Sequence, residues 1–424
     1  MTDEDTAVTR AWVLHPDIPS AETSRDPDRA LEEAVSLARA LPGISVQGAE
    51  AVRLPRPHPG TLFGKGRIAE LGERFREDGI DLVLVDGPVS PVQQRNLERE
   101  WGIKLLDRTG LILEIFSDRA ATREGVLQVE MAALSYQRTR LVRAWTHLER
   151  QRGGLGFVGG PGETQIEADR RAIDAQLVRL RKQLDKVVKT RELHRASRAK
   201  VPYPIVAMVG YTNAGKSTLF NRLTGAEVMV RDMLFATLDP TMRAVRLANG
   251  LDVILSDTVG FISDLPTELV AAFRATLEEV LAADLIVHVR DISHPETEAQ
   301  ARDVVAILEN LGVKGETPIL EVWNKMDNLP GPEASALRTR AAREDRVYPV
   351  SALDGEGMTP LLEAMARALE GERRCETLLL PFSEGRRRAW LHEQGVVEDE
   401  AQGEAGFEMT VRWTEKQAAR FREL

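Results

Sequence analysis

The sequence has little cysteine and no long apolar stretch. Its single cysteine, Cys375, cannot form an internal disulfide and has no partner at metal-ligand spacing, which fits a reducing compartment. No apolar run approaches the ~18 residues that a membrane-spanning helix needs. The opening segment, MTDEDTAVTR, is acidic and lacks the apolar centre of a secretory signal. We therefore expect a cytoplasmic protein without a membrane span.

The chain also lacks an overall excess of positive charge. Its 66 acidic residues outnumber 56 basic ones, for a formal net charge of −10 at pH 7. This balance argues against a protein that coats nucleic acid indiscriminately, although it does not exclude a local basic patch. A length of 424 residues with 43% hydrophobic content is enough for several domains with buried cores.

The clearest motif follows a short apolar run, 205–209, which we predict to be a buried strand. The next segment, GYTNAGKS, matches G-x-x-x-x-G-K-[ST] at every position. Its glycines let backbone N–H groups face phosphate oxygens, and the following helix adds the positive end of its dipole. We expect Lys216 to reach the β- and γ-phosphates and the Ser217 hydroxyl to ligate Mg²⁺. The predicted phosphate-binding residues are Gly210, Tyr211, Thr212, Asn213, Ala214, Gly215, Lys216 and Ser217.

A D-x-x-G segment follows the next predicted strand, 253–256. An acidic residue at a strand end can hold Mg²⁺ through water, and the glycine N–H can meet a γ-phosphate and sense its loss. The pattern alone is common, but at a strand end forty residues after a phosphate loop it becomes specific. The predicted residues are Asp257, Thr258, Val259 and Gly260.

The third motif, NKMD, follows the predicted strand 319–323 and indicates the base. The Asp327 carboxylate can accept hydrogen bonds from the ring N–H and the exocyclic amine of guanine, whereas adenine would leave it unpaired. Asn324 and Lys325 would brace the base loop, and a backbone N–H after the strand 347–350 would meet the guanine oxygen. These predictions give GTP as the nucleotide, bound at this end by Asn324, Lys325, Met326, Asp327, Ser351, Ala352 and Leu353.

Between the first two motifs lies LFATLDPT, where a mobile threonine would ligate Mg²⁺ and bond the γ-phosphate only in the GTP state. We favour Thr237, because its Phe-x-Thr-Leu context resembles the corresponding segment of related GTPases, and Thr241 remains the alternative. Lys216, Thr237 and Gly260 are thus the predicted catalytic residues, and Ser217 and Thr237 the metal ligands. The predicted contacts in this segment are Phe235, Ala236, Thr237, Leu238 and Asp239.

One departure from Ras-like enzymes concerns the residue after Gly260. Those enzymes place a water-orienting glutamine there, whereas this chain has Phe261, which cannot orient water. We therefore expect intrinsic hydrolysis to be slow, and a partner or an ion to supply the missing water-orienting element. Asn213 resembles the asparagine that binds K⁺ in some such GTPases, which makes K⁺ stimulation a hypothesis.

The composition changes along the chain and predicts four domains. Strand-like and helix-like stretches alternate over 1–135, an α/β pattern. Two long helices around a glycine-rich loop, 153–162, predict a hairpin over 136–200, which carries 16 Lys/Arg against 7 Asp/Glu. A solvated charged face and an anionic partner such as RNA both explain that excess. The GTPase domain is expected over 201–372, and a small α+β domain over 373–424.

The chain resembles HflX-type GTPases of the Obg-related branch over nearly its whole length. The resemblance rests on TLFGKGRIAEL (61–71), VSPVQQRNLE (89–98), the segments 107–136 and 159–171, and the nucleotide motifs. It implies an N-terminal α/β domain, a helical hairpin, a Ras-like P-loop GTPase domain and a small C-terminal domain. It also implies a cytosolic monomer that binds the large ribosomal subunit and its rRNA, and in some members separates stalled ribosomes under stress. ATP-linked activity is claimed for some relatives, but 1–135 holds no second phosphate loop to support it.

Three functions follow from these observations, and the first is favoured. It is a ribosome-associated GTPase switch whose GTP state docks the basic hairpin on RNA. The alternative is a GTP-controlled adaptor acting on a protein, such as a protease or a stress regulator, which would not need a basic hairpin. A metabolic P-loop kinase is disfavoured, because the guanine motif is present and no acceptor-substrate lid is evident.

Overall fold

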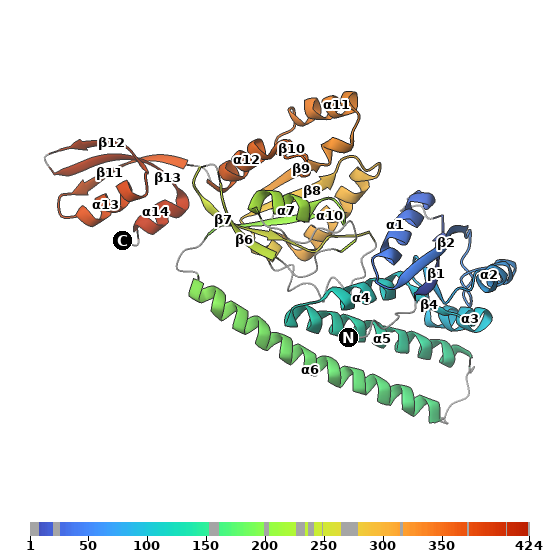
Figure 1. Ribbon diagram of the computed structural model, residues 1–424. Coiled ribbons are helices and arrows are strands. Elements are labelled where there is room, and N and C mark those ends of the chain that lie inside the picture. The colour runs from blue at the N-terminus through green and yellow to red at the C-terminus, as the bar shows by residue number, and fades with distance from the viewer. Residues whose placement is uncertain are drawn as a thin grey trace, which may run out of the picture.

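The computed structural model describes residues 8–19, 26–151, 161–198, 203–225, 234–235, 241–247, 249–263, 279–313, 317–370, 373–403 and 405–422, without side chains for 141–151, 161–166, 190–198, 370, 373, 414–416 and 419. Three separate sheets organise these residues. In Figure 1 the six-stranded sheet lies at the centre, the N-terminal sheet on the right and the C-terminal sheet on the left, with two long helices below. The predicted α/β fold class is confirmed.

The N-terminal sheet has four parallel strands in the order β2-β1-β3-β4, as alternating strands and helices predict. Side-chain caps begin the helices that start at Pro27 and Pro91: the Asp26 carboxylate accepts from two backbone N–H groups, and Ser90 forms a capping box with Gln93. The strands are β1 (Thr9–Asp17), β2 (Ile44–Arg53), β3 (Leu82–Val85) and β4 (Lys104–Asp107). The helices are α1 (Pro27–Arg39), α2 (Lys65–Glu77), α3 (Pro91–Trp101) and α4 (Arg108–Arg119).

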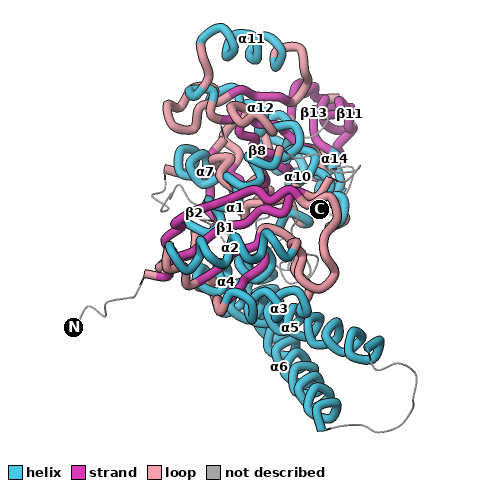
Figure 2. Tube along the Cα trace, turned by 90° about the vertical axis from the view of Figure 1, so that its right-hand side faces the viewer, coloured by secondary structure: helices cyan, strands magenta, loops and turns pink. Residues whose placement is uncertain are grey.

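Two long helices, α5 (Arg123–Gln151) and α6 (Pro161–Arg198), lie side by side and extend past the sheets in Figure 2. Leu177 and Leu180 of α6 are buried, and Arg138 of α5 pairs with Asp174 of α6 at 2.8 Å. The glycine-rich loop falls outside the described residues except for its last two positions, which already belong to α6.

The central sheet has the order β10-β9-β8-β5-β7-β6, and every pair is parallel except the β6–β7 pair. Loops at the carboxyl ends of parallel strands are where open α/β sheets bind ligands. This is the predicted Ras-like domain. Its strands are β5 (Ile205–Gly210), β6 (Thr241–Arg246), β7 (Asp252–Asp257), β8 (Leu285–Asp291), β9 (Ile319–Asn324) and β10 (Val347–Pro349). Its helices are α7 (Lys216–Thr224), α10 (Thr297–Leu311), η1 (Met326–Asn328), α11 (Gly331–Ala341) and α12 (Met358–Glu370).

The C-terminal sheet is antiparallel, in the order β11-β13-β12, and packs its own small core around Met409 and Trp413. Its three strands and two helices agree with the α+β composition predicted for this part of the chain. The elements are β11 (Arg373–Pro381), α13 (Gly385–Glu393), β12 (Val397–Gln402), β13 (Gly406–Thr414) and α14 (Glu415–Arg422). None of the helices within the described ranges is long and apolar enough to cross a membrane.

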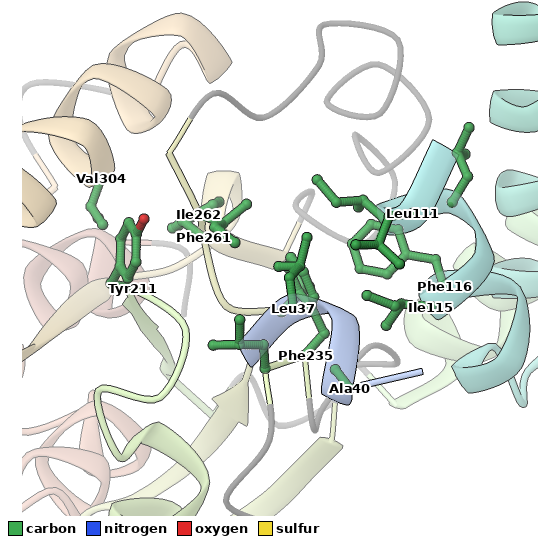
Figure 3. Packing of buried hydrophobic residues seen from close by; sticks show 14 of the residues in the cluster. Leu37, Ala40, Leu111, Ile115, Phe116, Tyr211, Phe235, Phe261, Ile262 and Val304 are labelled. Atoms are coloured by element: carbon green, nitrogen blue, oxygen red, sulfur yellow. The ribbon is translucent and has the colours of Figure 1, made fainter. Parts of the chain in front are cut away.

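One hydrophobic cluster joins the N-terminal domain to the central domain. Side chains from α1 and α4 meet Tyr211, Phe235, Phe261 and Ile262 in it, as Figure 3 shows. The rings of Phe116 and Phe235 meet edge to face, with centroids 4.7 Å apart. The predicted nucleotide loops therefore lie against a second domain.

Candidate nucleotide site

The phosphate loop connects β5 to α7 and needs glycine at both ends. A Cβ atom at Gly210 would lie 2.2 Å from the carbonyl oxygen of Val289, on the neighbouring strand. Gly215 has φ +89°, and a Cβ atom there would lie 2.2 Å from Asn324 Nδ2. Only glycine tolerates these approaches without a shift of the backbone or of Asn324. The loop thus curls tightly between two other strands of the sheet.

Lys216 begins α7 and folds back over the loop. Its Nζ donates hydrogen bonds to the carbonyl oxygens of Gly210 (3.1 Å) and Tyr211 (2.8 Å). Burial lowers the pKa of Lys216 to about 8, against the opposing effect of the Asp257 carboxylate. A phosphate bound at this point would place a negative charge next to the buried Lys216 ammonium and so stabilise its charged form.

Ser217 and Asp257 come from the first two motifs and meet in the structure. The Ser217 hydroxyl donates to Asp257 Oδ2 at 2.7 Å, and Asp257 lies buried at the end of β7. Hydroxyl and carboxylate oxygens are the donors that Mg²⁺ prefers. This pair therefore fits a magnesium ion, with Ser217 able to ligate it directly.

The D-x-x-G segment lies directly on the phosphate loop. Phe261 N–H donates to Gly210 O (3.1 Å), and Thr212 N–H donates to Phe261 O (2.7 Å). A Cβ atom at Gly260 would lie 3.0 Å from Lys216 Nζ. Gly260 is therefore next to the lysine predicted to hold the γ-phosphate. The Phe261 side chain is 1% exposed and belongs to the interdomain cluster.

The predicted base loop is tied to the phosphate loop through Asn324. Asn324 Nδ2 donates to Ala214 O (2.9 Å), and its Oδ1 accepts from Ala352 N–H (3.0 Å). Lys325 has φ +65° and pairs with Asp291 at 2.8 Å. Asp327 follows within η1. The structure thus joins the phosphate loop to the two segments that the sequence predicts to surround guanine.

The predicted switch segment is described only in part. Leu234 and Phe235 are buried, whereas Ala236, Thr237, Leu238 and Asp239 lie outside the described residues. Thr241 begins β6 opposite Asp257. The choice between Thr237 and Thr241 therefore stays a prediction.

Two N-terminal residues that the sequence motifs missed reach this site. Glu33 of α1 accepts a hydrogen bond from the Tyr211 hydroxyl (2.5 Å), and Arg108 of α4 donates to Ser263 O (2.9 Å). Between α1, the phosphate loop and the start of α10 lies a cavity of about 180 Å³ that Thr212 and Asn213 help to line. The signal that could have pointed to Arg108 is its place in the segment 107–136, on which the family resemblance rests.

Comparison with known families covers most of the chain. Four family models match in succession: GTP-binding GTPase N-terminal (28–117), GTP-binding GTPase Middle Region (119–198), 50S ribosome-binding GTPase (205–325) and HflX C-terminal domain (336–423). In this order they match the N-terminal sheet, the helical hairpin, the central sheet and the C-terminal sheet.

Individual relatives match over most of their length as well. The chain is 50% identical to a GTPase HflX of Magnetococcus marinus, over 89% of this chain and 86% of that protein. It is 45% identical to the GTPase HflX of Escherichia coli over 86% of each. Among solved structures, a GTP-binding protein of Sulfolobus solfataricus in complex with GDP is similar, with 23% identity, a TM-score of 0.46 and coverage of 85% and 99%. The conserved order of domains and these identities show that the chain belongs to the HflX family of GTPases.

Proposed function

We propose that this HflX-family GTPase is a GTP-hydrolysing switch that docks its helical hairpin on the large ribosomal subunit and splits or rescues stalled ribosomes under stress. In this proposal the protein acts as a cytoplasmic monomer. The hairpin meets ribosomal RNA, and hydrolysis of GTP releases it.

The nucleotide site takes the roles that its motifs predict. Lys216 binds the β- and γ-phosphates, Ser217 and Thr237 ligate Mg²⁺, and the Gly260 N–H reads the γ-phosphate. Asp327 recognises guanine between the Lys325 stem and the segment that begins at Ser351. The Ser217–Asp257 contact of 2.7 Å supports the metal assignment.

The observation that carries the ribosomal part is the charge of α6. Its described exposed side chains include seven basic residues and three acidic ones, on a helix that extends past the body of the protein in Figure 2. An extended arm with one dominant sign of charge suits a phosphate backbone. The exposed basic residues are Arg170, Arg171, Arg179, Arg181, Lys182, Lys186 and Lys189.

Co-sedimentation with purified large subunits tests this proposal. The protein would be loaded with GDP or a non-hydrolysable GTP analogue and spun with subunits over a salt series. We expect binding that needs the GTP analogue and weakens steeply with salt, because phosphate contacts release counterions. Salt-insensitive binding, or none, would contradict RNA docking and favour a protein-directed adaptor.

A matched pair of triple variants sharpens that experiment. Arg179→Gln, Arg181→Gln and Lys182→Gln together should lower the logarithmic salt slope by about 2–3, since each lost phosphate contact contributes about 0.9. The control changes Arg338, Arg340 and Arg343 to glutamine, which alters the net charge equally on the distant helix α11 and the turn after it. If both variants weaken binding to the same degree, the hairpin is not the docking element.

Hydrolysis itself is tested with and without subunits, in Na⁺ and in K⁺. Phe261 predicts slow turnover of the free protein and stimulation by subunits. K⁺ stimulation would support Asn213 as a cation ligand. Fast turnover in Na⁺ alone, without subunits, would argue against both dependencies.

A further inference from the structure

The peptide group of Ser263, just past the D-x-x-G motif, is held from two directions. Its N–H donates to the Tyr211 hydroxyl at 2.9 Å, and its carbonyl oxygen accepts from Arg108 Nη2 at 2.9 Å. Tyr211 belongs to the phosphate loop, whereas Arg108 belongs to the N-terminal domain, 155 residues away in the chain. The backbone that follows Gly260 is thus fastened both to the nucleotide site and to a separate domain.

Glu33 connects the two groups that hold Ser263. Its carboxylate accepts from the Tyr211 hydroxyl at 2.5 Å and from Arg108 Nη2 at 2.6 Å. Arg108 also donates to Asp86 at 2.5 Å, and His15 lies 2.8 Å from that same carboxylate. We call Arg108, Glu33 and Tyr211 the interdomain clamp.

The clamp is buried and charged. The side chains of Arg108 and Glu33 are 7% and 13% exposed, and that of Asp86, which pairs with Arg108, is 7% exposed. Burial by itself would lower the pKa of Arg108, but the carboxylates of Asp86 and Glu33 hold it above its ordinary value. Hydrogen bonds to charged groups in such surroundings are stronger and geometrically stricter than those on the surface. The clamp can therefore define one position for the Ser263 backbone.

That position matters because no polar side chain next to Gly260 points at the phosphates. Phe261 is buried in the interdomain cluster, and Figure 3 shows it grouped with Ile262 and near Tyr211. The backbone of 260–263 must then set the distance between the Gly260 N–H and Lys216. A displacement of about 1 Å at such a point is enough to slow a reaction about 100-fold.

We propose that Arg108 is a positioning residue for GTP hydrolysis. Arg108 contacts Ser263 directly, and it contacts Tyr211 indirectly through Glu33. Both routes keep the Gly260 segment in contact with the phosphate loop. The N-terminal domain thereby becomes part of the hydrolytic machinery of the free protein. This role goes beyond ribosome docking and does not depend on it.

Single-turnover GTP hydrolysis by the full-length Arg108→Met variant, without ribosomes, is the primary test. We expect the maximal rate to fall about tenfold, while the enzyme concentration at half-maximal rate and the Kd for a fluorescent GDP analogue change less than threefold. Arg108→Lys keeps the charge but cannot span the same acceptors, so it should recover part of the rate. This split between rate and affinity separates positioning from a general loss of structure.

Arg140→Met is the matched control. Arg140 is also a largely buried arginine, and it donates to Asp107 at 3.1 Å and to Gln94 and Tyr136, all of them N-terminal to the central domain. The Arg140→Met variant should hydrolyse GTP at a maximal rate within twofold of wild type. Equal losses in the two arginine variants would overturn the proposal.

Tyr211→Phe provides a test that removes no buried charge. It removes only the hydroxyl that joins Glu33 to Ser263, and we expect a loss in maximal rate of about fivefold. In the double variant with Arg108→Met the losses should not multiply, because both act through one unit. A wild-type rate in Tyr211→Phe, a rate above wild type in either variant, or fully multiplicative losses would each contradict the clamp.

Discussion

The predicted guanine end and the predicted γ-phosphate end of the site are built in different ways. Among the described residues, the guanine end is assembled within the central domain: Asn324 joins Ala214 to Ala352, and Lys325 pairs with Asp291. The γ-phosphate end also receives Glu33 and Arg108 from the N-terminal domain.

This difference separates recognition of the base from control of hydrolysis. A base loop tied to strands of one sheet does not require the second domain to be in place. The Gly260 segment, by contrast, packs in a cluster shared between the domains, where Phe116 contacts Phe235. We therefore expect nucleotide affinity to be a property of the central domain and the rate of hydrolysis to depend on how the domains dock.

The largest effect is expected where the two ends meet, at Gly215. In Gly215→Ala the added Cβ would collide with Asn324 at 2.2 Å in a left-handed backbone conformation. Strain and the lost Asn324 hydrogen bonds should together weaken GDP and GTP binding at least about 100-fold. Gly312→Ala is the control, because Gly312 has φ +81° but no atom within 4 Å. Similar affinities of both variants in fluorescence titrations would show that the contact with Asn324 is unimportant.

Asp327→Asn should damage the guanine end alone. An amide cannot accept both N–H groups of guanine, so affinity for GTP should fall about 100-fold. Xanthosine triphosphate, which offers a carbonyl in place of the exocyclic amine, should bind this variant better than GTP. At saturating nucleotide the rate of hydrolysis should stay within about threefold of wild type. A collapse of that rate would mean that the two ends are not separable.

Phe116→Ala should affect the γ-phosphate end and its link to the N-terminal domain. Loss of this buried ring should cost about 3 kcal/mol of unfolding free energy and slow hydrolysis more than it weakens GDP binding. Phe75→Ala is the matched control, since Phe75 is 1% exposed and packs edge to face on Trp101 within the N-terminal domain. Urea denaturation and single-turnover assays would compare them. Equal kinetic effects would count against a special role for the interdomain cluster.

The smallest effect that we expect is a loss of folding stability at acidic pH. Burial lowers the pKa of His288, on the central strand β8, to about 4, with Glu321 opposing. Because the unfolded histidine titrates near 6.5, its contribution is complete above pH 6.5 and is lost as the pH falls toward 4, by about 2 kcal/mol at pH 5.

The ion pair between Asp86 and the clamp residue Arg108 should be lost only at lower pH. Burial alone would raise the pKa of Asp86, but Arg108 and His15 hold it below its ordinary value of 3.8, so its contribution is lost only below that value.

The His288 effect is measured by urea denaturation. Between pH 7 and pH 5, the urea midpoint of the wild-type protein should fall, and that of His288→Leu should fall less. Equal losses in both proteins would rule out His288 as the cause.

Much of the site follows from local sequence. The phosphate loop, the D-x-x-G segment and the base loop each follow an apolar strand, and parallel strands place their carboxyl ends along one edge. That is why Ser217 and Asp257, forty residues apart, could be expected to meet. The polar edge strand β12, VEDEAQ, had no comparable apolar pattern, and pairing with β13 is what makes it a strand.

The sequence by itself determined the nucleotide class, the order of the domains and the family, because each rests on short segments whose chemistry is local. Only the tertiary structure decided that Arg108 and Glu33 lie at the predicted γ-phosphate end and that Phe261 is buried in the interdomain cluster. Contacts across 155 and 178 residues leave no periodicity in the chain. They arise when two domains bury a common apolar surface and carry their charged groups to its edge.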